Sequence, residues 1–288
     1  MSLVIWAEGR MVGAGEAVMS AVDHGITVGD GVFETCTVFD GRVFALTRHL
    51  ARLARSAAGL GLEAPDEGKV RDGVAAVLQE GVRADGPFDG RLRITVTAGV
   101  GPLGSGRVEG AQTVVVAAQE SVMAPESRSV RSPWPRNERS AVAGLKTTSY
   151  AENVVALAHA KAQGADETIL PNTVGELCEG TGSNVFVERD GELVTPRLDS
   201  GALAGITREL LIEWGTEAGL PVREARVSEL PFAVLDEVGD GGTHLVLTSS
   251  GRNVQPVTWL DGVDVAVGEI SREARALFET LCRERIDP

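Results

Sequence analysis

Residues 144–150 read Gly-Leu-Lys-Thr-Thr-Ser-Tyr, and their lysine differs from the two others in the chain. Lys69 and Lys161 lie in charged or polar segments with a helical pattern. Lys146 follows a Gly-Leu pair and has no charged neighbour nearer than Glu152. A poorly solvated lysine can lose its proton near neutral pH and attack a carbonyl group. Lys146 is therefore a candidate for Schiff-base chemistry, and the competing interpretation is a surface lysine beside the start of a helix.

Two further motifs follow the lysine. Residues 175–186 read Gly-Glu-Leu-Cys-Glu-Gly-Thr-Gly-Ser-Asn-Val-Phe, and residues 200–209 read Ser-Gly-Ala-Leu-Ala-Gly-Ile-Thr-Arg-Glu. Together with residues 30–34 (Asp-Gly-Val-Phe-Glu) and 248–250 (Thr-Ser-Ser), they resemble the class IV aminotransferase superfamily, the fold-type IV pyridoxal-phosphate enzymes. That superfamily includes branched-chain aminotransferases, D-amino-acid aminotransferases and 4-amino-4-deoxychorismate lyases. The resemblance covers nearly the whole chain, and it is specific because four motifs occur in the expected order.

The resemblance implies an α/β (α+β) fold of two domains. We expect a smaller N-terminal α/β domain over residues 1–118 and a larger cofactor-binding domain over residues 131–288. The larger domain should be a mixed, β-barrel-like sheet with flanking helices. Residues 119–130 are expected to link the two, because Pro125 and its polar neighbours interrupt the periodic pattern. A length of 288 residues suits one large or two medium domains.

Hydrophobic periodicity predicts the individual elements. Strands are expected at residues 32–39, 42–45, 91–98, 113–118, 167–170, 184–188, 193–195, 221–227 and 244–248. Helices are expected at residues 48–60, 70–78, 152–163, 207–218 and 270–285. Asp-Gly pairs at residues 40–41 and 190–191 predict hairpin turns.

Charge and composition narrow the function classes. The net charge of −14 argues against nucleic acid or an anionic membrane as partner, so an anionic small-molecule substrate would need a local basic pocket. The chain starts without the regions of a signal peptide and holds no apolar run of membrane-spanning length. Three scattered cysteines indicate a reducing compartment, and we expect a cytoplasmic protein. Four scattered histidines give no metal-binding motif, so no metal site is expected.

The expected cofactor is pyridoxal 5′-phosphate, which needs a lysine, a group at the pyridine nitrogen and a site for its phosphate. The resemblance assigns Lys146 to the cofactor's aldehyde carbon and to proton transfer. It assigns Glu179 to the pyridine nitrogen. Glu176, three residues earlier, competes for this role, but the Gly-Thr-Gly after Glu179 would let the backbone approach the ring. A surface position in a hairpin is the alternative for Glu179.

The phosphate is expected at Gly205-Ile206-Thr207, at the start of the helix predicted from residue 207. Free N–H groups and the positive end of the helix dipole favour a dianion there, although Thr207 could equally be an ordinary N-cap. By resemblance, Ser250 supplies a second hydroxyl group.

An arginine is expected to bind the same phosphate. Arg52 matches the family's phosphate arginine, and a guanidinium can bind phosphate through two parallel bonds. Arg48 and Arg55 lie three or four residues away on the predicted helix and remain alternatives.

Tyr150, the only tyrosine, lies near the family's cofactor-binding tyrosine, although that tyrosine lies one residue further on in branched-chain enzymes. The resemblance also places further residues in the site. The additional cofactor contacts are Ser183, Asn184 and Leu203. The substrate contacts are Phe33, Thr35 and Arg93, of which Arg93 could equally be an exposed strand residue.

The reaction expected from the resemblance is that of 4-amino-4-deoxychorismate lyase, which eliminates pyruvate to give 4-aminobenzoate in folate biosynthesis. Branched-chain enzymes hold a glutamate side chain at positions that match Val28 and Thr37, and neither residue can replace a tyrosine and an arginine. D-amino-acid enzymes carry an Arg-x-His pair where residues 100–104 read Val-Gly-Pro-Leu-Gly. The alternatives are a class IV transaminase, branched-chain or D-amino-acid, and a cofactor-binding protein without turnover. A homodimer is expected from the resemblance.

Overall fold

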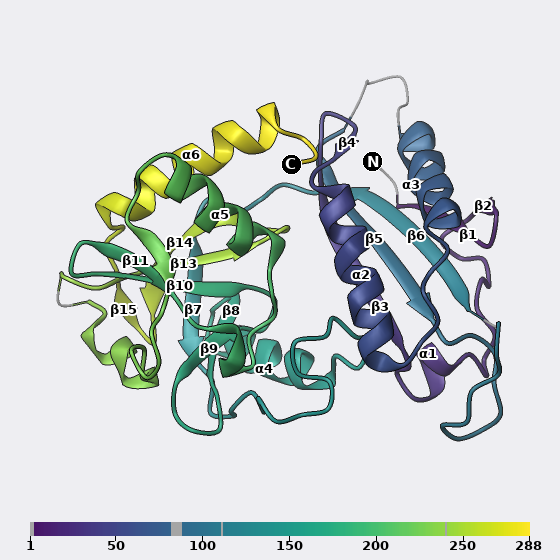
Figure 1. The fold of residues 1–288 in the computed structure, drawn as a ribbon, viewed down its shortest axis with the longest axis horizontal. Coiled ribbons are helices and arrows are strands. Elements are labelled where there is room, and N and C mark those ends of the chain that lie inside the picture. The colour runs from purple at the N-terminus through teal and green to yellow at the C-terminus, as the bar shows by residue number, and fades with distance from the viewer. Residues whose placement is uncertain (1–2, 82–87, 111, 240) are drawn as a thin grey trace. The chain divides into compact units, whose positions relative to one another are not determined.

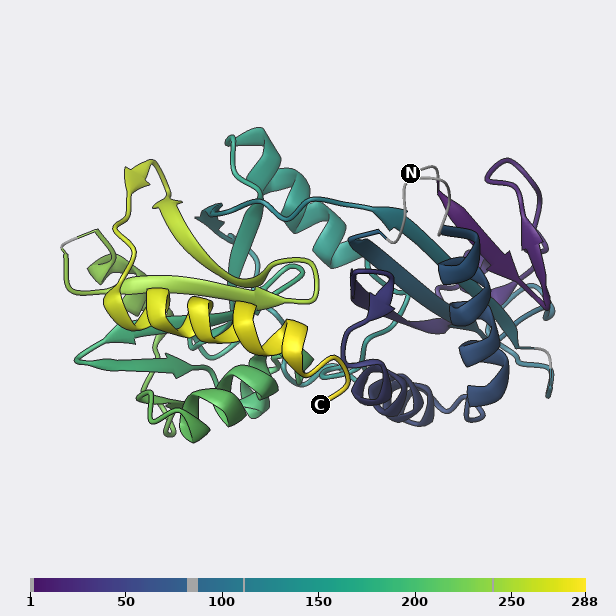
Figure 2. The same ribbon diagram turned by 90° about the horizontal axis from the view of Figure 1, so that it is seen from above.

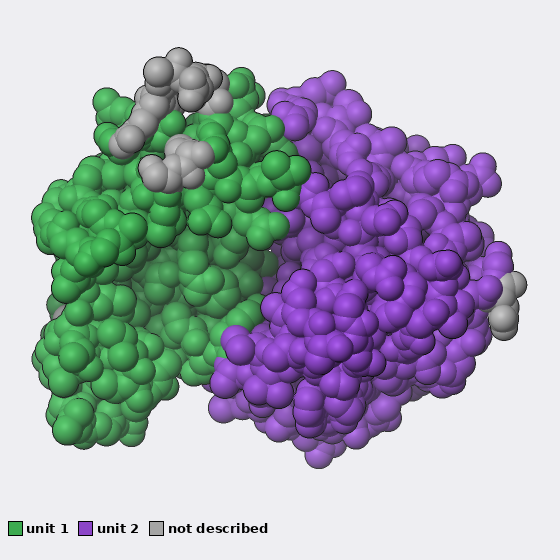
Figure 3. All heavy atoms as spheres, turned by 180° about the vertical axis from the view of Figure 1, so that it is seen from behind, with its two compact units in different colours: residues 1–122, 145–150, 285–288 green, residues 123–144, 151–284 purple. Residues whose placement is uncertain are grey.

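The computed structural model describes residues 3–81, 88–110, 112–239 and 241–288, and the chain divides into two compact units (Figure 3). Unit 1 comprises Met1–Val122, Leu145–Tyr150 and Arg285–Pro288. Unit 2 comprises Met123–Gly144 and Ala151–Glu284. Unit 1 therefore includes two segments that are remote from it in sequence, and one of them carries Lys146.

Unit 1 is built on a curled six-stranded sheet in the order β2-β1-β6-β5-β3-β4, with every neighbouring pair antiparallel (Figure 1). Its strands are β1 (Val4–Ala7), β2 (Arg10–Val12), β3 (Gly31–Phe39), β4 (Arg42–Val43), β5 (Gly90–Thr97) and β6 (Thr113–Glu120). Its helices are α1 (His24–Thr27), α2 (Leu46–Leu60) and α3 (Glu67–Gly81).

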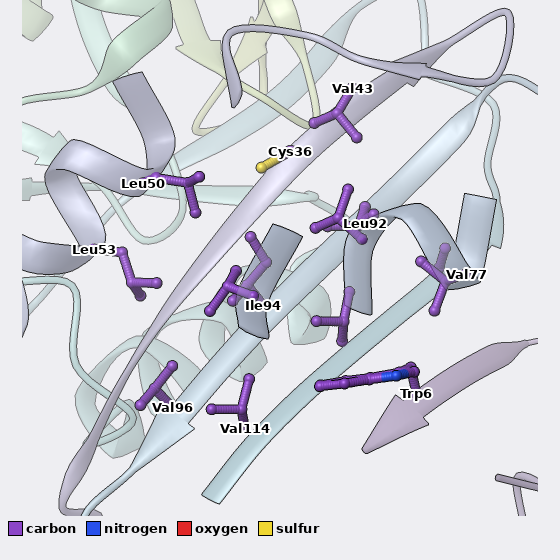
Figure 4. Packing of buried hydrophobic residues seen from close by; sticks show 14 of the residues in the cluster. Trp6, Cys36, Val43, Leu50, Leu53, Val77, Leu92, Ile94, Val96 and Val114 are labelled. Carbon is purple, nitrogen blue, oxygen red and sulfur yellow. The ribbon is translucent and has the colours of Figure 1, made fainter. Parts of the chain in front are cut away.

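The core of unit 1 lies between one face of this sheet and the helices α2 and α3 (Figure 4). Successive side chains of a strand point to opposite faces, so Leu92, Ile94 and Val96 of β5 are buried in this core. The alternate residues of β5, which include Arg93, lie on the opposite face of the sheet. Strand alternation thus places the substrate-contact candidate Arg93 outside the core.

Helix α2 carries polar residues among its buried apolar ones. It ends at Gly61, whose φ of 74° lets its N–H group bond back to the last helical carbonyl groups. Leu53 packs in the core, while His49, Arg52 and Ser56 are buried polar residues of the same helix. Buried polar groups need partners, and those of α2 are described below.

Unit 2 is built on a curled mixed sheet in the order β12-β11-β10-β13-β14-β7-β8-β9, with β15 paired to β14. Its strands are β7 (Ser127–Arg131), β8 (Glu167–Pro171), β9 (Leu177–Gly180), β10 (Asn184–Arg189), β11 (Glu192–Thr195), β12 (Val222–Glu224), β13 (His244–Ser249), β14 (Asn253–Leu260) and β15 (Val263–Asp264). Its helices are α4 (Ala151–Ala162), α5 (Ile206–Glu217) and α6 (Glu269–Glu284), with the 3₁₀ turns η1 (Leu198–Ser200) and η2 (Phe232–Glu237).

Helices α5 and α6 pack side by side against this sheet (Figures 1 and 2). Trp214 of α5 and Phe278 of α6 have ring centroids 5.1 Å apart. The start of α6 is fixed by the buried carboxylate of Glu188 in β10, which accepts hydrogen bonds from the N–H groups of Ile270 (3.1 Å) and Ser271 (2.8 Å). Such an interaction satisfies N–H groups that have no partner within the helix.

The structure confirms the expected two-part α/β fold with a larger mixed sheet, and all five predicted helices are present. The strand predicted at residues 221–227 was too long, because β12 pairs with the short β11 and ends at Glu224. The predicted linker, residues 119–130, contains the end of β6 and the first four residues of β7.

None of the helices in the described ranges combines the length and the apolar character that crossing a membrane requires.

Candidate active site

The lysine segment is fixed against β3 and α2 within unit 1. The N–H group of Phe33 donates to the carbonyl oxygen of Lys146 (3.1 Å), and Thr148 N–H donates to Gly31 (2.8 Å). On the other side, Lys146 N–H donates to the hydroxyl oxygen of Ser56 on α2 (3.1 Å). The backbone of Lys146 is therefore held by a strand and a helix, while its side chain projects from an ordered segment.

Two aromatic rings surround the lysine amine. Nζ of Lys146 lies 4.4 Å from the ring centroid of Phe33 and 5.8 Å from that of Tyr150. The two rings meet edge to face, with centroids 5.2 Å apart and an interplanar angle of 81°. An aromatic face attracts a cation and excludes water. The sequence-predicted residues Lys146, Phe33 and Tyr150 are thus brought together.

Arg93 lies at the same aromatic cluster. Its guanidinium carbon is 3.7 Å from the ring centroid of Phe33, and its Nε donates a long hydrogen bond to Thr95 (3.3 Å). Thr35, the other predicted substrate contact, pairs with Arg93 across β3 and β5. A cation that binds carboxylates therefore lies against the ring that the lysine amine also contacts.

The predicted phosphate arginine is buried in an ion pair. Nε and Nη2 of Arg52 donate to the two carboxylate oxygens of Glu34 at 2.8 and 2.6 Å, and His49 Nδ1 lies 2.7 Å from the same carboxylate. Burial alone would raise the pKa of Glu34, but the charge and hydrogen bonds of Arg52 lower it to about 2. Burial lowers the pKa of His49, which keeps the ring neutral against the opposing effect of Glu34.

The alternative arginines lie in different surroundings. Nε of Arg48 donates to the carbonyl oxygen of Pro288 (3.1 Å), and Arg55 is exposed. Only Arg52 among the three is buried. Its place in the phosphate site stays a prediction, and two of its N–H groups are directed at Glu34.

In unit 2, Glu179 is buried near the end of β9. One carboxylate oxygen accepts the N–H group of Leu203 (2.9 Å), and the other lies 3.3 Å from Nε of Arg136. Glu176, the competing candidate, lies in the preceding turn and accepts a hydrogen bond from Asn172 (3.2 Å). The sequence reasoning missed Arg136, because its segment carries no motif.

The turn after Glu179 is organised by a second buried carboxylate, Glu167. It accepts hydrogen bonds from Thr181 N–H (2.9 Å) and from the hydroxyl group of Ser183 (2.9 Å). The hydroxyl hydrogen of Ser183 is therefore directed at Glu167, although Ser183 was predicted to contact the cofactor. That prediction is not tested by these bonds, because the hydroxyl oxygen can still accept.

The predicted phosphate site at the start of α5 has the features that an anion requires. The N-cap is Gly205, which offers no capping side chain. Ile206 and Thr207 are each 2% exposed. Asn184 fixes the preceding turn through a hydrogen bond from Nδ2 to Leu203 O (2.8 Å). The N-cap residue thus supplies no side-chain hydrogen bond to the helix N-terminus, and an amide side chain from β10 holds the preceding turn.

Two further features belong to this region. A Cβ atom at residue 205 would lie 1.9 Å from Oδ1 of Asn184, so only glycine leaves the required space. The hydroxyl oxygen of Thr248, opposite Asn184 in the sheet, is buried and has no hydrogen-bond partner within the described residues. Ser250, the predicted second hydroxyl, lies two residues beyond and is partly buried. Within unit 2, the start of α5 thus has features that suit the phosphate of pyridoxal phosphate, and the carboxylate of Glu179 is of a kind that can accept a hydrogen bond from its pyridine nitrogen.

Within the described ranges, no group of three or more histidine, cysteine, aspartate or glutamate side chains could hold a metal ion. The three cysteines are buried and free.

Several known proteins are similar to this chain over nearly its whole length. A candidate branched-chain-amino-acid aminotransferase from Methanocaldococcus jannaschii is 31% identical over 285 residues, which cover 96% of each chain. A D-alanine aminotransferase from Listeria innocua is 29% identical and covers 90% of this chain and 88% of its own. An aminodeoxychorismate lyase from Bacillus subtilis is 28% identical and covers 98% of this chain and 94% of its own.

A solved structure of an aminotransferase from Mycobacterium tuberculosis in its PLP-bound form superposes with a TM-score of 0.82. It is 27% identical and covers 97% of this chain and 98% of its own. The family profile described as "Amino-transferase class IV" matches residues 31–260. This chain belongs to the class IV aminotransferase family, and its cofactor is pyridoxal 5′-phosphate.

Proposed function

We propose that the chain is a pyridoxal-phosphate-dependent aminotransferase that moves an amino group from an amino acid to a 2-oxo acid. The observation that carries this proposal is the cluster of Lys146, Phe33 and Arg93 in unit 1. The amine and the guanidinium both contact the Phe33 ring, at 4.4 and 3.7 Å from its centroid. A substrate with an amino group and a nearby carboxylate matches this pair of groups, because a guanidinium binds a carboxylate through two parallel hydrogen bonds.

Each side chain of the cluster has a separate role in the proposed reaction. Pyridoxal phosphate, when bound, withdraws electrons from the carbon that bears the substrate's amino group. Nζ of Lys146 holds the cofactor at rest and then moves the proton of that carbon as general base and acid. Arg93 orients the carboxylate, and Phe33 and Tyr150 keep water from the amine.

The remaining predicted residues hold the cofactor. Glu179 would accept a hydrogen bond from the pyridine nitrogen, and the N-terminus of α5 would bind the phosphate, for which Arg52 is the predicted arginine. The uncapped, buried start of α5 supports the phosphate assignment. The buried carboxylate of Glu179 supports the other assignment, since an ionised carboxylate can only accept hydrogen bonds.

Amino transfer is favoured over elimination by the relatives, most of which carry aminotransferase names. The lyase remains the second candidate because of Val28 and Thr37. Val28 is 44% exposed and Thr37 is 1% exposed, and neither carries a charge for the distal carboxylate of glutamate. An aminotransferase built this way should prefer acceptors with one carboxylate, because a second buried carboxylate would lack a cation.

The test compares products from the purified holoprotein. Leucine, valine or D-alanine is supplied with pyruvate or 2-oxoglutarate, and aminodeoxychorismate is supplied with no 2-oxo acid. We expect a new amino acid from at least one donor–acceptor pair. Pyruvate and 4-aminobenzoate from aminodeoxychorismate, without amino transfer, would instead establish the lyase. A spectral change with amines but no product would indicate cofactor binding without turnover.

Arg93→Met tests the substrate site in the same assay. We expect KM for the amino acid to rise about tenfold or more, since the lost hydrogen bonds involve two charged groups. The matched control is Arg42→Met, which removes an exposed cation from β4 of the same unit. If the two substitutions changed KM equally, Arg93 would not belong to the proposed substrate site.

A further inference from the structure

A buried guanidinium lies against the carboxylate that we assign to the pyridine nitrogen. Nε of Arg136 is 3.3 Å from Oε1 of Glu179 and has no hydrogen-bond partner within the described residues. The side chains of Arg136 and Glu179 are 15% and 11% exposed. A buried polar atom without a hydrogen bond is costly and needs an explanation, and here the charge of the nearby carboxylate provides it.

The fold fixes the backbone on which Arg136 lies. The N–H group of Arg136 donates to Pro171 O at the end of β8 (2.7 Å). Two residues later, Glu138 accepts from the N–H and the hydroxyl group of Thr173, at 2.9 and 2.6 Å. A Cβ atom at Gly201 would lie 3.0 Å from Cα of Glu138, so the neighbouring turn packs closely against this segment. These contacts fix the backbone position of Arg136.

The far side of the guanidinium is also anchored. Nη1 of Arg136 donates to Oδ1 of Asn153 on α4 (3.2 Å). The amide nitrogen of Asn153 donates in turn to the carbonyl oxygen of Thr181, in the turn that follows Glu179. Arg136 thus contacts Glu179 directly and, through Asn153 in the first turn of α4, is linked to Thr181 in the turn that follows Glu179.

Glu179 depends on this cation for its orientation. Its Oε2 is fixed by the N–H group of Leu203 (2.9 Å), and Oε1 faces Arg136. Without the guanidinium, Oε1 of the carboxylate would lose the cation that lies 3.3 Å from it. A buried carboxylate left without a cation rotates toward water or takes up a proton, and a protonated carboxyl group is a poorer acceptor.

We propose that Arg136 is a positioning residue, which holds Glu179 ionised and aimed at the pyridine nitrogen of the cofactor. This inference rests on the proposed role of Glu179. It makes a specific claim: Arg136 affects cofactor binding only through the ring nitrogen. A merely structural role would affect every ligand of the site alike.

The test measures the affinity of the apoprotein for two ligands, by titration of intrinsic fluorescence. One is pyridoxal phosphate, and the other is its 1-deaza analogue, which has C–H in place of the ring nitrogen. The variants are Arg136→Met, Arg136→Lys and Glu179→Gln. The control is Arg139→Gln, which removes an 82% exposed guanidinium three residues along the same segment. Circular dichroism confirms that each variant is folded, and Arg136→Gln replaces Arg136→Met if the latter does not fold.

We expect the wild-type protein to prefer pyridoxal phosphate over the deaza analogue by about tenfold or more, as for hydrogen bonds between charged groups. Arg136→Met should lose most of this preference, Arg136→Lys should keep part of it, and Arg139→Gln should keep all of it. Equal loss for both ligands, or no loss, overturns the inference.

Glu179→Gln separates this inference from the proposed function. If Glu179→Gln removes the preference and Arg136→Met does not, only the role of Arg136 is wrong. If the wild-type protein has no preference for the ring nitrogen, the placement of Glu179 is wrong and the inference about Arg136 is overturned with it.

Discussion

At the residue scale, a buried ion pair between Glu34 and Arg52 stabilises the part of unit 1 that holds the segment of Lys146. Glu34 lies on the face of β3 that packs against α2, and Arg52 and His49 reach it from that helix. A carboxylate so buried is stable only when its oxygens are paired. The lysine segment is bonded to the same strand and the same helix, so this ion pair supports the surface on which Lys146 lies.

Glu34→Gln should change the acid stability of the protein. The folded pKa of Glu34 is about 2, below its ordinary value of 4.5, so its ion pair stabilises the fold above pH 4.5 and loses this effect as the pH falls toward 2. His49 also lowers the stability of the fold as the pH falls below its ordinary pKa of 6.5. Its pKa is lower in the folded state, so acid favours the unfolded chain, in which the ring takes up a proton more readily.

Chemical denaturation between pH 7 and pH 2 measures this effect. The variant should be less stable at pH 7, because Arg52 loses its buried partner, and its free energy of unfolding should fall less between pH 4.5 and pH 2. Glu67→Gln, which removes an exposed ion pair of α3, serves as control and should match the wild-type protein. An unchanged acid dependence in Glu34→Gln would show that the ion pair is not formed in solution.

Gly205→Ala should weaken cofactor binding without unfolding the chain. The backbone of Gly205 has φ −73°, which alanine adopts freely, so the only cost is the contact of the new Cβ with Asn184. Displacement of Asn184 should loosen the start of α5 and lower the affinity for pyridoxal phosphate about tenfold, roughly one charged hydrogen bond. Gly242→Ala, where no atom lies within 4 Å of the new Cβ, is the control. Equal affinities of the Gly205→Ala and Gly242→Ala variants for pyridoxal phosphate would show that the N-terminus of α5 does not bind the phosphate.

The sequence indicated candidate residues where a motif occurs, but it did not indicate their partners. Lys146, Glu179 and Gly205 were found from short segments whose order is characteristic. Arg136 and Glu167 were not found, because a buried ion pair or hydrogen bond joins residues far apart in sequence and leaves no local pattern. The sequence also could not show that two N–H groups of Arg52 face a carboxylate.

At the scale of elements, periodicity predicted the five helices of 12 or more residues and most of the strands that have four or more residues. Helix α2 shows why: its buried residues recur at helical spacing, and a glycine follows its last turn. Strands β9 and β14 are two of the strands that were missed. Both are buried along nearly their whole length, so they lack the alternation that reveals a half-exposed strand.

The start of α6 provides a test at this scale. Glu188→Ala removes an acceptor for two N–H groups and one hydroxyl group at the helix N-terminus. We expect a loss of about 1.5–3 kcal/mol in stability, seen as a Tm lower by roughly 2–4 °C per kcal/mol. Glu273→Ala, an exposed position on α6, should leave Tm unchanged. Equal Tm values for both variants would mean that Glu188 does not stabilise the helix.

At the scale of the whole molecule, the two units are not continuous in sequence. Leu145–Tyr150 and Arg285–Pro288 belong to unit 1, although each lies next to a segment of unit 2. The linker predicted at residues 119–130 spans the first boundary between the units, between Val122 and Met123, but composition could not reveal the later returns to unit 1. These returns are made by backbone hydrogen bonds, such as Ala45 N–H to Ile286 O (2.7 Å), which any residue type can form.

A homodimer is expected from the family resemblance. Multi-angle light scattering of the holoprotein should give twice the chain mass of 30.2 kDa. A fully active species with the mass of one chain would rule the dimer out.

The central claim is that Lys146 carries the cofactor, and borohydride reduction followed by peptide mapping tests it most directly. Reduction makes the bond between lysine and pyridoxal phosphate permanent, and the chain offers only three lysines. Nζ of Lys69 is paired with Glu8 (2.8 Å), and Lys161 is an exposed residue of α4. We predict that the label lies on Lys146, in the peptide that contains residues 144–150, and that Lys146→Ala abolishes it. A label on Lys69 or Lys161 would contradict the account.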